Sequence, residues 1–125
     1  MSPVEQVHAL WSAFASRGPL ASLDHVAEEC EWIPSADLPH DRPVRGAAAM
    51  REYVERLDRQ GVRIEPALHT CEQLGDDVLV GGRMRVVSRA ALIDSPLFWL
   101  YRVRGGRVVR IESYVSRADA LRAAA

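Results

Sequence analysis

The N-terminal half of the chain carries apolar residues at the spacing of amphipathic helices. Three segments show this pattern: residues 4–14, a short stretch that Ser22 is placed to cap, and Ala47–Leu57. Gly18 and Pro19 follow the first segment and Gly61 follows the third, and both are residues that typically end helices. The pattern therefore predicts three helices ahead of most of the strands.

After Gly61 the pattern changes to the alternation that is typical of β-strands. Turn residues at 75–77 and 105–106 divide the region, so it predicts a four-strand antiparallel meander. The predicted strands are Val62–Leu74, Val78–Arg89, Ala91–Arg104 and Arg107–Ser116, after a brief strand at Cys30–Ile33. Gly81 and Gly82 fall inside a strand and predict a bulge or a bend that lets the sheet curl.

Helices followed by a long meander predict an α+β fold. We expect a cone-shaped, curved antiparallel sheet, made of the short strand and the four-strand meander, packed by three N-terminal helices around a hydrophobic pocket. Residues 1–125 suit a single domain, because no linker or repeat divides them. The proline-rich stretch 34–43 is predicted to be a loop at the mouth of the pocket, and residues 117–125 a short helical tail.

Composition and motifs exclude several classes of protein. The 16 basic and 17 acidic residues give a net charge of -1, which favours neither nucleic acid nor a membrane as partner. Because no signal-peptide pattern or long apolar run is present, we expect a cytoplasmic location. Cys30 and Cys71 are predicted to be buried apolar residues. No nucleotide, zinc or serine-hydrolase motif occurs, so neither a cofactor nor a metal is expected.

Arg83 and Arg85 share one face of a predicted strand, whereas Met84 and Val86 share the other. Alternation leaves two orientations open. The arginines either face water, or they face into the cone, where a carboxylate or an anionic ligand would have to offset their desolvation.

Acidic and imidazole side chains on the proline-rich loop are candidates for acid-base chemistry. Asp37, His40 and Asp41 either reach the pocket mouth as acid or base, or remain solvated surface residues.

Aromatic residues form the candidate walls of the pocket. Trp11, Phe14, Trp32 and Tyr53 either fill the core or contact a ligand. The strand at Ala91–Arg104 is apolar on both faces, with 97, 99 and 101 on one and 98 and 100 on the other. We expect one face to line the pocket and the other to meet a second copy of the chain.

The order of these elements, with the segments Arg45–Tyr53 and Gly106–Val115, resembles SnoaL-like and ketosteroid isomerase-like proteins of the nuclear transport factor 2-like superfamily. The resemblance implies a cone with a small-molecule pocket in a homodimer, on a fold that hosts both enzymes and binding domains. It aligns Trp11, Ile33 and Trp99 with the tyrosine, the general base and the oxyanion-hole acid of ketosteroid isomerase. Because these groups are replaced, steroid isomerisation is not expected.

Comparison with limonene epoxide hydrolase implies an arginine retained at Arg83, but it aligns Arg85 and Ser113 with the two catalytic aspartates. Both families turn the positions of Arg83 and Arg85 toward the cavity. The acid-base aspartate of SnoaL-like cyclases falls near Ser113, with Glu112 adjacent but on the opposite strand face.

These observations predict a SnoaL-like small-molecule pocket protein. It is either an isomerase, cyclase or hydrolase of a hydrophobic polyketide-like or terpenoid-like metabolite, or a non-catalytic ligand-binding or dimerisation module. The catalytic candidates are Arg83, Arg85, His40, Asp37 and Glu112. The candidate ligand-binding residues are Trp11, Phe14, Trp32, Met50, Tyr53, Trp99, Tyr101 and Ser113.

The ligand is expected to be small and hydrophobic, or an anionic aromatic molecule. The homodimer is expected to form through the outer sheet face around Phe98, Leu100, Met84 and Tyr114.

Overall fold

The computed structural model describes residues 1–35, 38 and 43–124. Its helices are α1 (Pro3–Arg17), α2 (Pro19–Ser22), the 3-10 helix η1 (Leu23–His25), α3 (Ala47–Arg59) and α4 (Arg117–Ala124). Its strands are β1 (Val26–Ile33), β2 (Val44–Arg45), β3 (Arg63–Leu74), β4 (Asp77–Val87), β5 (Leu92–Arg104) and β6 (Arg107–Tyr114). The predicted α+β class is confirmed.

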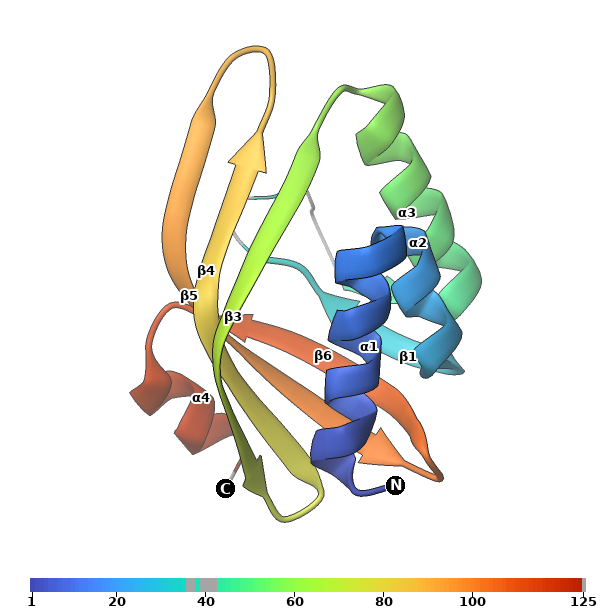
Figure 1. The fold of residues 1–125 in the computed structure, drawn as a ribbon, viewed down its shortest axis with the longest axis vertical. Coiled ribbons are helices and arrows are strands. Elements are labelled where there is room, and N and C mark those ends of the chain that lie inside the picture. The colour runs from blue at the N-terminus through green and yellow to red at the C-terminus, as the bar shows by residue number, and fades with distance from the viewer. Residues whose placement is uncertain (36–37, 39–42, 125) are drawn as a thin grey trace.

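The strands form one curved, unclosed sheet in the order β2-β1-β6-β5-β4-β3 (Figure 1). Strands β3 to β6 make the predicted antiparallel meander. β1 instead runs parallel to β6, with Val26 opposite Val108, and antiparallel to the two-residue β2. The parallel pair and β2 were not predicted, because strand alternation carries no information about which distant strands pair.

Local side-chain chemistry sets the ends of α1. The Ser2 hydroxyl accepts from the Glu5 N–H and the Glu5 carboxylate accepts from the Ser2 N–H, which is a capping box. Gly18 ends the helix with φ 90°, in the left-handed region that favours glycine.

The second helix begins four residues earlier than the sequence predicted, because its N-cap is Gly18 and not Ser22. α2 starts at Pro19, which is favourable at a first helical position, and Ser22 is its last residue instead of its cap. The Ser22 hydroxyl donates to the Pro19 carbonyl at 2.6 Å. As a result, Val26 is the first residue of β1 and not part of a helix.

Two apolar clusters lie on opposite faces of the sheet. Helices α1 and α3 pack on the inner face, where the larger cluster includes the alternate residues 97, 99, 101 and 103 of β5. On the outer face α4 covers a smaller cluster built on Leu79, Leu100 and Ala120 (Figure 1). The predicted division of β5 into two apolar faces is confirmed, but a helix of the same chain covers much of the outer one.

Gly81 and Gly82 lie opposite an irregularity in β3, where the register shifts between Leu68 and Thr70. A Cβ atom on Gly82 would lie 1.9 Å from the carbonyl oxygen of Ala67, so the backbones approach closely only because this residue is glycine. The irregularity thus lies in β3, opposite the two glycines at which the sequence placed a bulge or a bend.

No helix in the described parts of the chain is both long enough and apolar enough to cross a bilayer. The cytoplasmic location stays a prediction.

Candidate functional site

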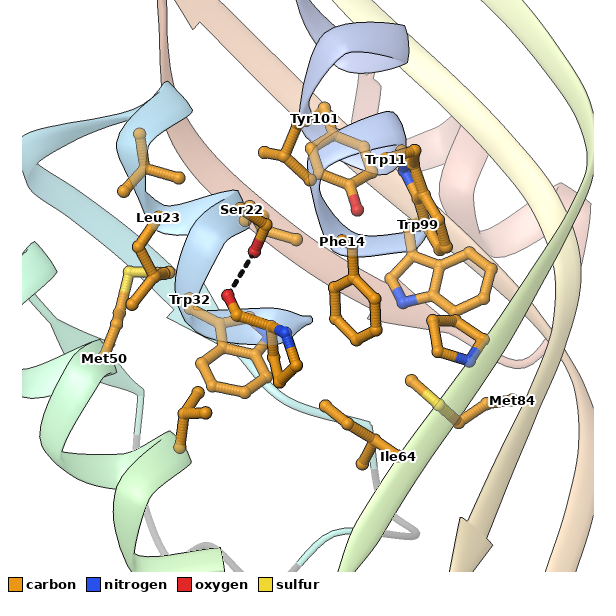
Figure 2. A pocket seen from close by; sticks show the side chains of 16 residues that line it. Trp11, Phe14, Ser22, Leu23, Trp32, Met50, Ile64, Met84, Trp99 and Tyr101 are labelled. Carbon is orange, nitrogen blue, oxygen red and sulfur yellow. Dashed lines mark hydrogen bonds between the residues drawn. The ribbon is translucent and has the colours of Figure 1, made fainter. Parts of the chain in front are cut away.

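The inner face of the sheet and the N-terminal helices surround a pocket with a cavity volume of about 80 Å³ (Figure 2). Aromatic side chains dominate its wall. They are Trp11, Phe14, Trp32, Trp99 and Tyr101. The wall of this cavity draws on helices and strands that are far apart in the sequence.

The aromatic wall follows from helical and strand periodicity. Trp11 and Phe14 are three residues apart on one face of α1, and their ring centroids lie 6.3 Å apart. Trp99 and Tyr101 are alternate residues of β5 and point to the same face of the sheet. The rings of Trp11 and Trp99 meet at 5.2 Å and 71°, an edge-to-face contact that joins helix to sheet.

α3 contributes to the pocket directly and indirectly. Met50 lines it, as predicted, together with Val54 one turn later. Tyr53 does not line it; its ring packs at 90° against Trp32 with centroids 5.2 Å apart. Burial raises the pKa of Tyr53. This side chain therefore packs against a residue of the wall, and its contact with a ligand stays a prediction.

Few polar atoms reach the pocket. The Ser22 hydroxyl is engaged with the Pro19 carbonyl. Burial raises the pKa of Tyr101, and the indole N–H of Trp11, which approaches the phenol oxygen, offsets part of that rise. This approach falls short of full hydrogen-bond geometry, so the buried Trp11 N–H has no acceptor among the described residues.

Ser113 does not line the pocket. It lies opposite Trp99 across the β5–β6 ladder, on the same face of the sheet. Its hydroxyl is buried and has no hydrogen-bond partner in the described part of the chain.

Arg83 and Arg85 lie on the outer face, because Met84 between them lines the pocket. The Arg83 Nε is 2.9 Å from Asp94 Oδ1 and the Arg85 Nε is 3.6 Å from Glu65 Oε1. The two arginine side chains are 45% and 50% exposed. Of the two orientations that alternation left open, the structure therefore has the outward one, and the catalytic role of either arginine stays a prediction. Burying Met84 stabilises the fold, whereas burying two guanidinium groups would cost their hydration.

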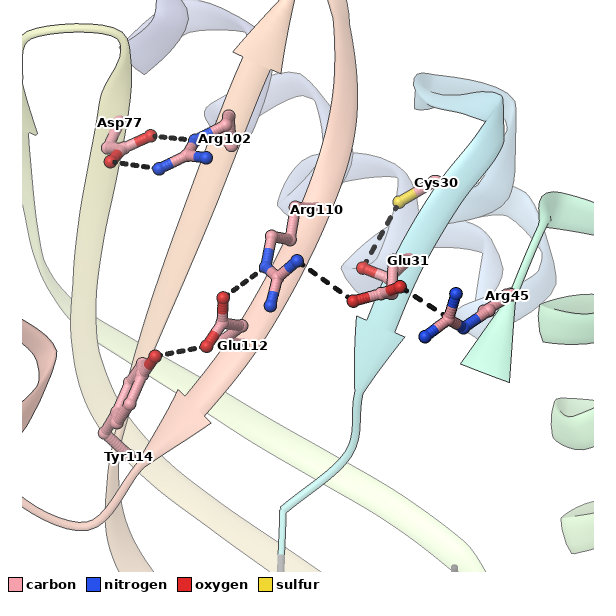
Figure 3. A network of polar contacts seen from close by, with 8 residues as sticks. All are labelled: Cys30, Glu31, Arg45, Asp77, Arg102, Arg110, Glu112 and Tyr114. Atoms are coloured by element: carbon pink, nitrogen blue, oxygen red, sulfur yellow. Dashed lines mark hydrogen bonds and ion pairs between the residues drawn. The ribbon is translucent and has the colours of Figure 1, made fainter. Parts of the chain in front are cut away.

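Glu112 also lies outside the pocket (Figure 3). Its carboxylate accepts from the Arg110 guanidinium and from the Tyr114 hydroxyl. Arg110 Nη1 lies 3.0 Å from a Glu31 carboxylate oxygen, and Arg45 Nε lies 3.4 Å from the other. Burial, together with the hydrogen bond to Glu112 and its charge, raises the pKa of Tyr114 to about 12. Glu112 thus belongs to a network that joins β2, β1 and β6 on the outer face, the strand face that the sequence predicted for it, and its catalytic role stays a prediction.

The remaining acid-base candidates, Asp37, His40 and Asp41, lie outside the described residues. Pocket residues that sequence reasoning missed include Ile64, Pro66 and Met84. The alternation of 64 and 66 in β3 could have indicated the first two. Met84 had been assigned to the outer face, which is wrong because it is 6% exposed within the inner cluster.

Neither cysteine is suited to metal binding or nucleophilic chemistry. Burial, with the nearby charges of Glu29 and Glu31, raises the pKa of Cys30 to about 12, and burial raises that of Cys71. Both thiols therefore stay protonated near neutral pH. Among residues 1–35, 38 and 43–124, no group of three His, Cys, Asp or Glu side chains could hold a metal ion.

Comparison with known proteins gives one family. A model of the SnoaL-like domain matches residues 7–111. A search of curated proteins gives no match.

Solved structures share the fold at low sequence identity. A nuclear transport factor 2-like protein from Burkholderia thailandensis superposes with a TM-score of 0.81 at 23% identity, covering 97% of this chain and 98% of the other. An LEH-like epoxide hydrolase from M. tuberculosis superposes with a TM-score of 0.73 at 15% identity, covering 96% of this chain and 86% of the other. TerC, co-crystallised with polyporic acid, superposes with a TM-score of 0.72 at 21% identity, covering 98% of each chain. At these identities the similarity shows a common fold.

Proposed function

The chain belongs to the SnoaL-like family, and on that premise we propose that its pocket binds one small, neutral and mainly apolar molecule without converting it. The observation that carries the proposal is the chemistry of the wall. Among the described residues it holds hydroxyl and indole groups but no carboxylate, imidazole, amine, guanidinium or thiol. Acid-base catalysis needs a group that exchanges protons near neutral pH, and burial raises the pKa of Tyr101 away from that range.

The size of the cavity narrows the ligand class. A volume of about 80 Å³ is roughly half that of the ~150 Å³ apolar cavity known to admit benzene. This space encloses only part of a single-ring molecule, whose remainder would lie outside it, and it is far too small for a whole polycyclic metabolite. TerC, a neighbour in fold, was crystallised with polyporic acid, which supports a small-molecule ligand.

A neutral ligand is favoured over the anionic aromatic molecule that the sequence left open. That expectation depended on Arg83 and Arg85 facing the cavity, and both lie on the outer face. A carboxylate entering the pocket would lose its hydration without meeting a described cation. The loss of Arg83, Arg85 and Glu112 from the pocket also weakens the isomerase, cyclase and hydrolase alternatives.

Indole fluorescence tests the proposal directly, because all 3 tryptophans of the chain line the pocket. We expect toluene to change the emission saturably, and benzoate, which is similar in size but charged, to bind at least about tenfold more weakly. Ile64→Phe, which fills the wall, should abolish the toluene response. Leu92→Phe, at a position 58% exposed outside the pocket, should leave it unchanged.

Two outcomes would contradict the proposal. One is the absence of saturable binding of any neutral single-ring compound. The other is repeated turnover of a small reactive substrate such as styrene oxide, detected by mass spectrometry, because a pocket that only binds forms no product.

We also propose a homodimer, with a smaller contact surface than the sequence suggested. Of the four residues expected there, Met84 faces the pocket and Leu100 is 5% exposed beneath α4. Phe98 and Tyr114 remain half-buried on the outer face. Sedimentation equilibrium tests this, since a mass of 13.9 kDa would identify a monomer.

A further inference from the structure

Building on the proposed binding function, we propose that the Tyr101 hydroxyl, assisted by the indole N–H of Trp11, is the hydrogen-bonding anchor of the pocket. The ligand would then present a neutral acceptor oxygen, such as that of a ketone or an ether, to this pair. The pair lies where β5 meets α1, within the aromatic wall.

The first step of the argument is that the pocket wall carries two donor groups, of which the buried Trp11 N–H has no acceptor among the described residues. Tyr101 is 4% exposed, and it lines the pocket. Figure 2 shows its oxygen directed toward the space between Trp11, Phe14 and Trp99. The Trp11 N–H is buried and has no acceptor among the described residues. Buried donors of this kind are destabilising until an acceptor reaches them, which a ligand oxygen could do.

The second step is the direction of the donors. An indole N–H can only donate, and that of Trp11 approaches the phenol oxygen of Tyr101. A hydroxyl proton aimed at this N–H would meet another donor hydrogen, so the Tyr101 O–H is directed away from Trp11, and its side chain lines the pocket. Burial raises the pKa of this hydroxyl, so it remains a protonated donor at neutral pH. The matching ligand group is therefore an acceptor.

The third step is the charge and position of that acceptor. The guanidinium groups of Arg83 and Arg85 lie on the other face of the sheet, so no counterion from them reaches the anchor. A neutral oxygen loses less hydration than a carboxylate on entering the pocket. The rings of Phe14 and Trp99 lie beside the hydroxyl (Figure 2) and offer apolar faces to the rest of the ligand. An aromatic ketone combines the two features.

Acetophenone and ethylbenzene distinguish the anchor from simple apolar binding, because they are similar in size and only the ketone carries an acceptor. Their dissociation constants are measured by calorimetry for the wild type and for Tyr101→Phe. We expect the preference for acetophenone over ethylbenzene to fall about three- to tenfold in the variant, the usual worth of one hydrogen bond. Tyr114→Phe is the matched control, since its hydroxyl binds Glu112 on the outer face, and it should keep the wild-type preference.

The outcomes separate the anchor from the pocket itself. If both compounds bind and Tyr101→Phe leaves their ratio unchanged, the anchor is wrong and the binding function stands. If neither compound binds the wild type, the binding function fails and the anchor fails with it. Should Tyr101→Phe not fold, the infrared carbonyl band of acetophenone bound to the wild type decides. A shift to lower frequency than in hexane supports the hydrogen bond, and an unshifted band overturns it.

Discussion

The indole of Trp11 meets that of Trp99 edge to face, with centroids 5.2 Å apart and ring planes at 71°. This contact joins α1 to β5, which supplies alternate residues to the inner cluster. It also forms one wall of the pocket, so the same pair serves folding and ligand binding. Aromatic pairs in this arrangement stabilise the fold by more than the burial of their apolar area alone.

A double-mutant cycle on this pair should show coupling. Trp99→Ala is expected to lower the free energy of unfolding by about 3–5 kcal/mol, because the residue is 4% exposed. Trp11→Ala should cost less, since Trp11 is only partly buried. The double variant should be more stable than the sum of the single effects predicts by about 0.5–1.5 kcal/mol, as measured by urea unfolding. Strict additivity would show that the rings pack without a specific interaction.

Gly82→Ala is expected to destabilise the sheet by more than 2 kcal/mol, about the size of a strained backbone contact. Its new Cβ would lie 1.9 Å from the Ala67 carbonyl oxygen, and neither strand can move without breaking the ladder. Thermal unfolding of the variant and the wild type measures this loss of stability.

Gly81→Ala supplies the matched comparison. There the nearest atom is the side-chain Oγ1 of Thr70, at 2.6 Å, so Thr70→Ala should recover part of the stability. The same rescue should fail for Gly82→Ala because its clash is with backbone. Equal stability of Gly82→Ala and the wild type would mean that the two strands are further apart than described.

The buried carboxylate of Asp77 depends on Arg102, whose Nε lies 3.0 Å from Oδ1 and Nη2 3.4 Å from Oδ2 (Figure 3). Arg102→Leu should cost about 2 kcal/mol in chemical unfolding. This is less than the 3–5 kcal/mol for breaking a fully buried pair, because 39% of the Arg102 side chain is in solvent. Arg45→Leu is the control. Its side chain is 77% exposed, so its pair with Glu31 should be worth under about 1 kcal/mol.

Stability should fall at alkaline pH because of Cys30. Burial raises the pKa of this thiol to about 12 in the folded protein, against about 8.5 in an unfolded chain. The folded state therefore holds the proton more tightly, and the stabilisation is complete below pH 8.5 and is lost as the pH rises toward 12. The slope is about 1.4 kcal/mol per pH unit. When the pH is raised from 9 to 11, the free energy of unfolding of Cys30→Ala should fall by on the order of 2 kcal/mol less than that of the wild type.

Val7→Ala is the matched control for this titration, because Val7 is also fully buried but carries no ionisable group. It should lower stability by a similar amount at every pH. If Cys30→Ala follows the same alkaline slope as the wild type, another group dominates the loss.

The sequence by itself determined the local elements and the two faces of each strand. Helix-forming stripes located α1 and α3, and strand alternation placed Trp99 and Tyr101 together, opposite Phe98 and Leu100. Such periodicities follow from backbone geometry alone, so they can be recognised without knowledge of the partner segments.

The tertiary structure decided which face turns inward and which distant segments meet. Alternation separated Arg83 and Arg85 from Met84, but only the packing of β4 against the helices showed that Met84 lines the pocket. The approach of Trp11 to Tyr101 and the pairing of β1 with β6 likewise join residues far apart in the chain. Which face is buried depends on the apolar area buried and the charges kept hydrated across the whole molecule. A local sequence pattern does not contain this information.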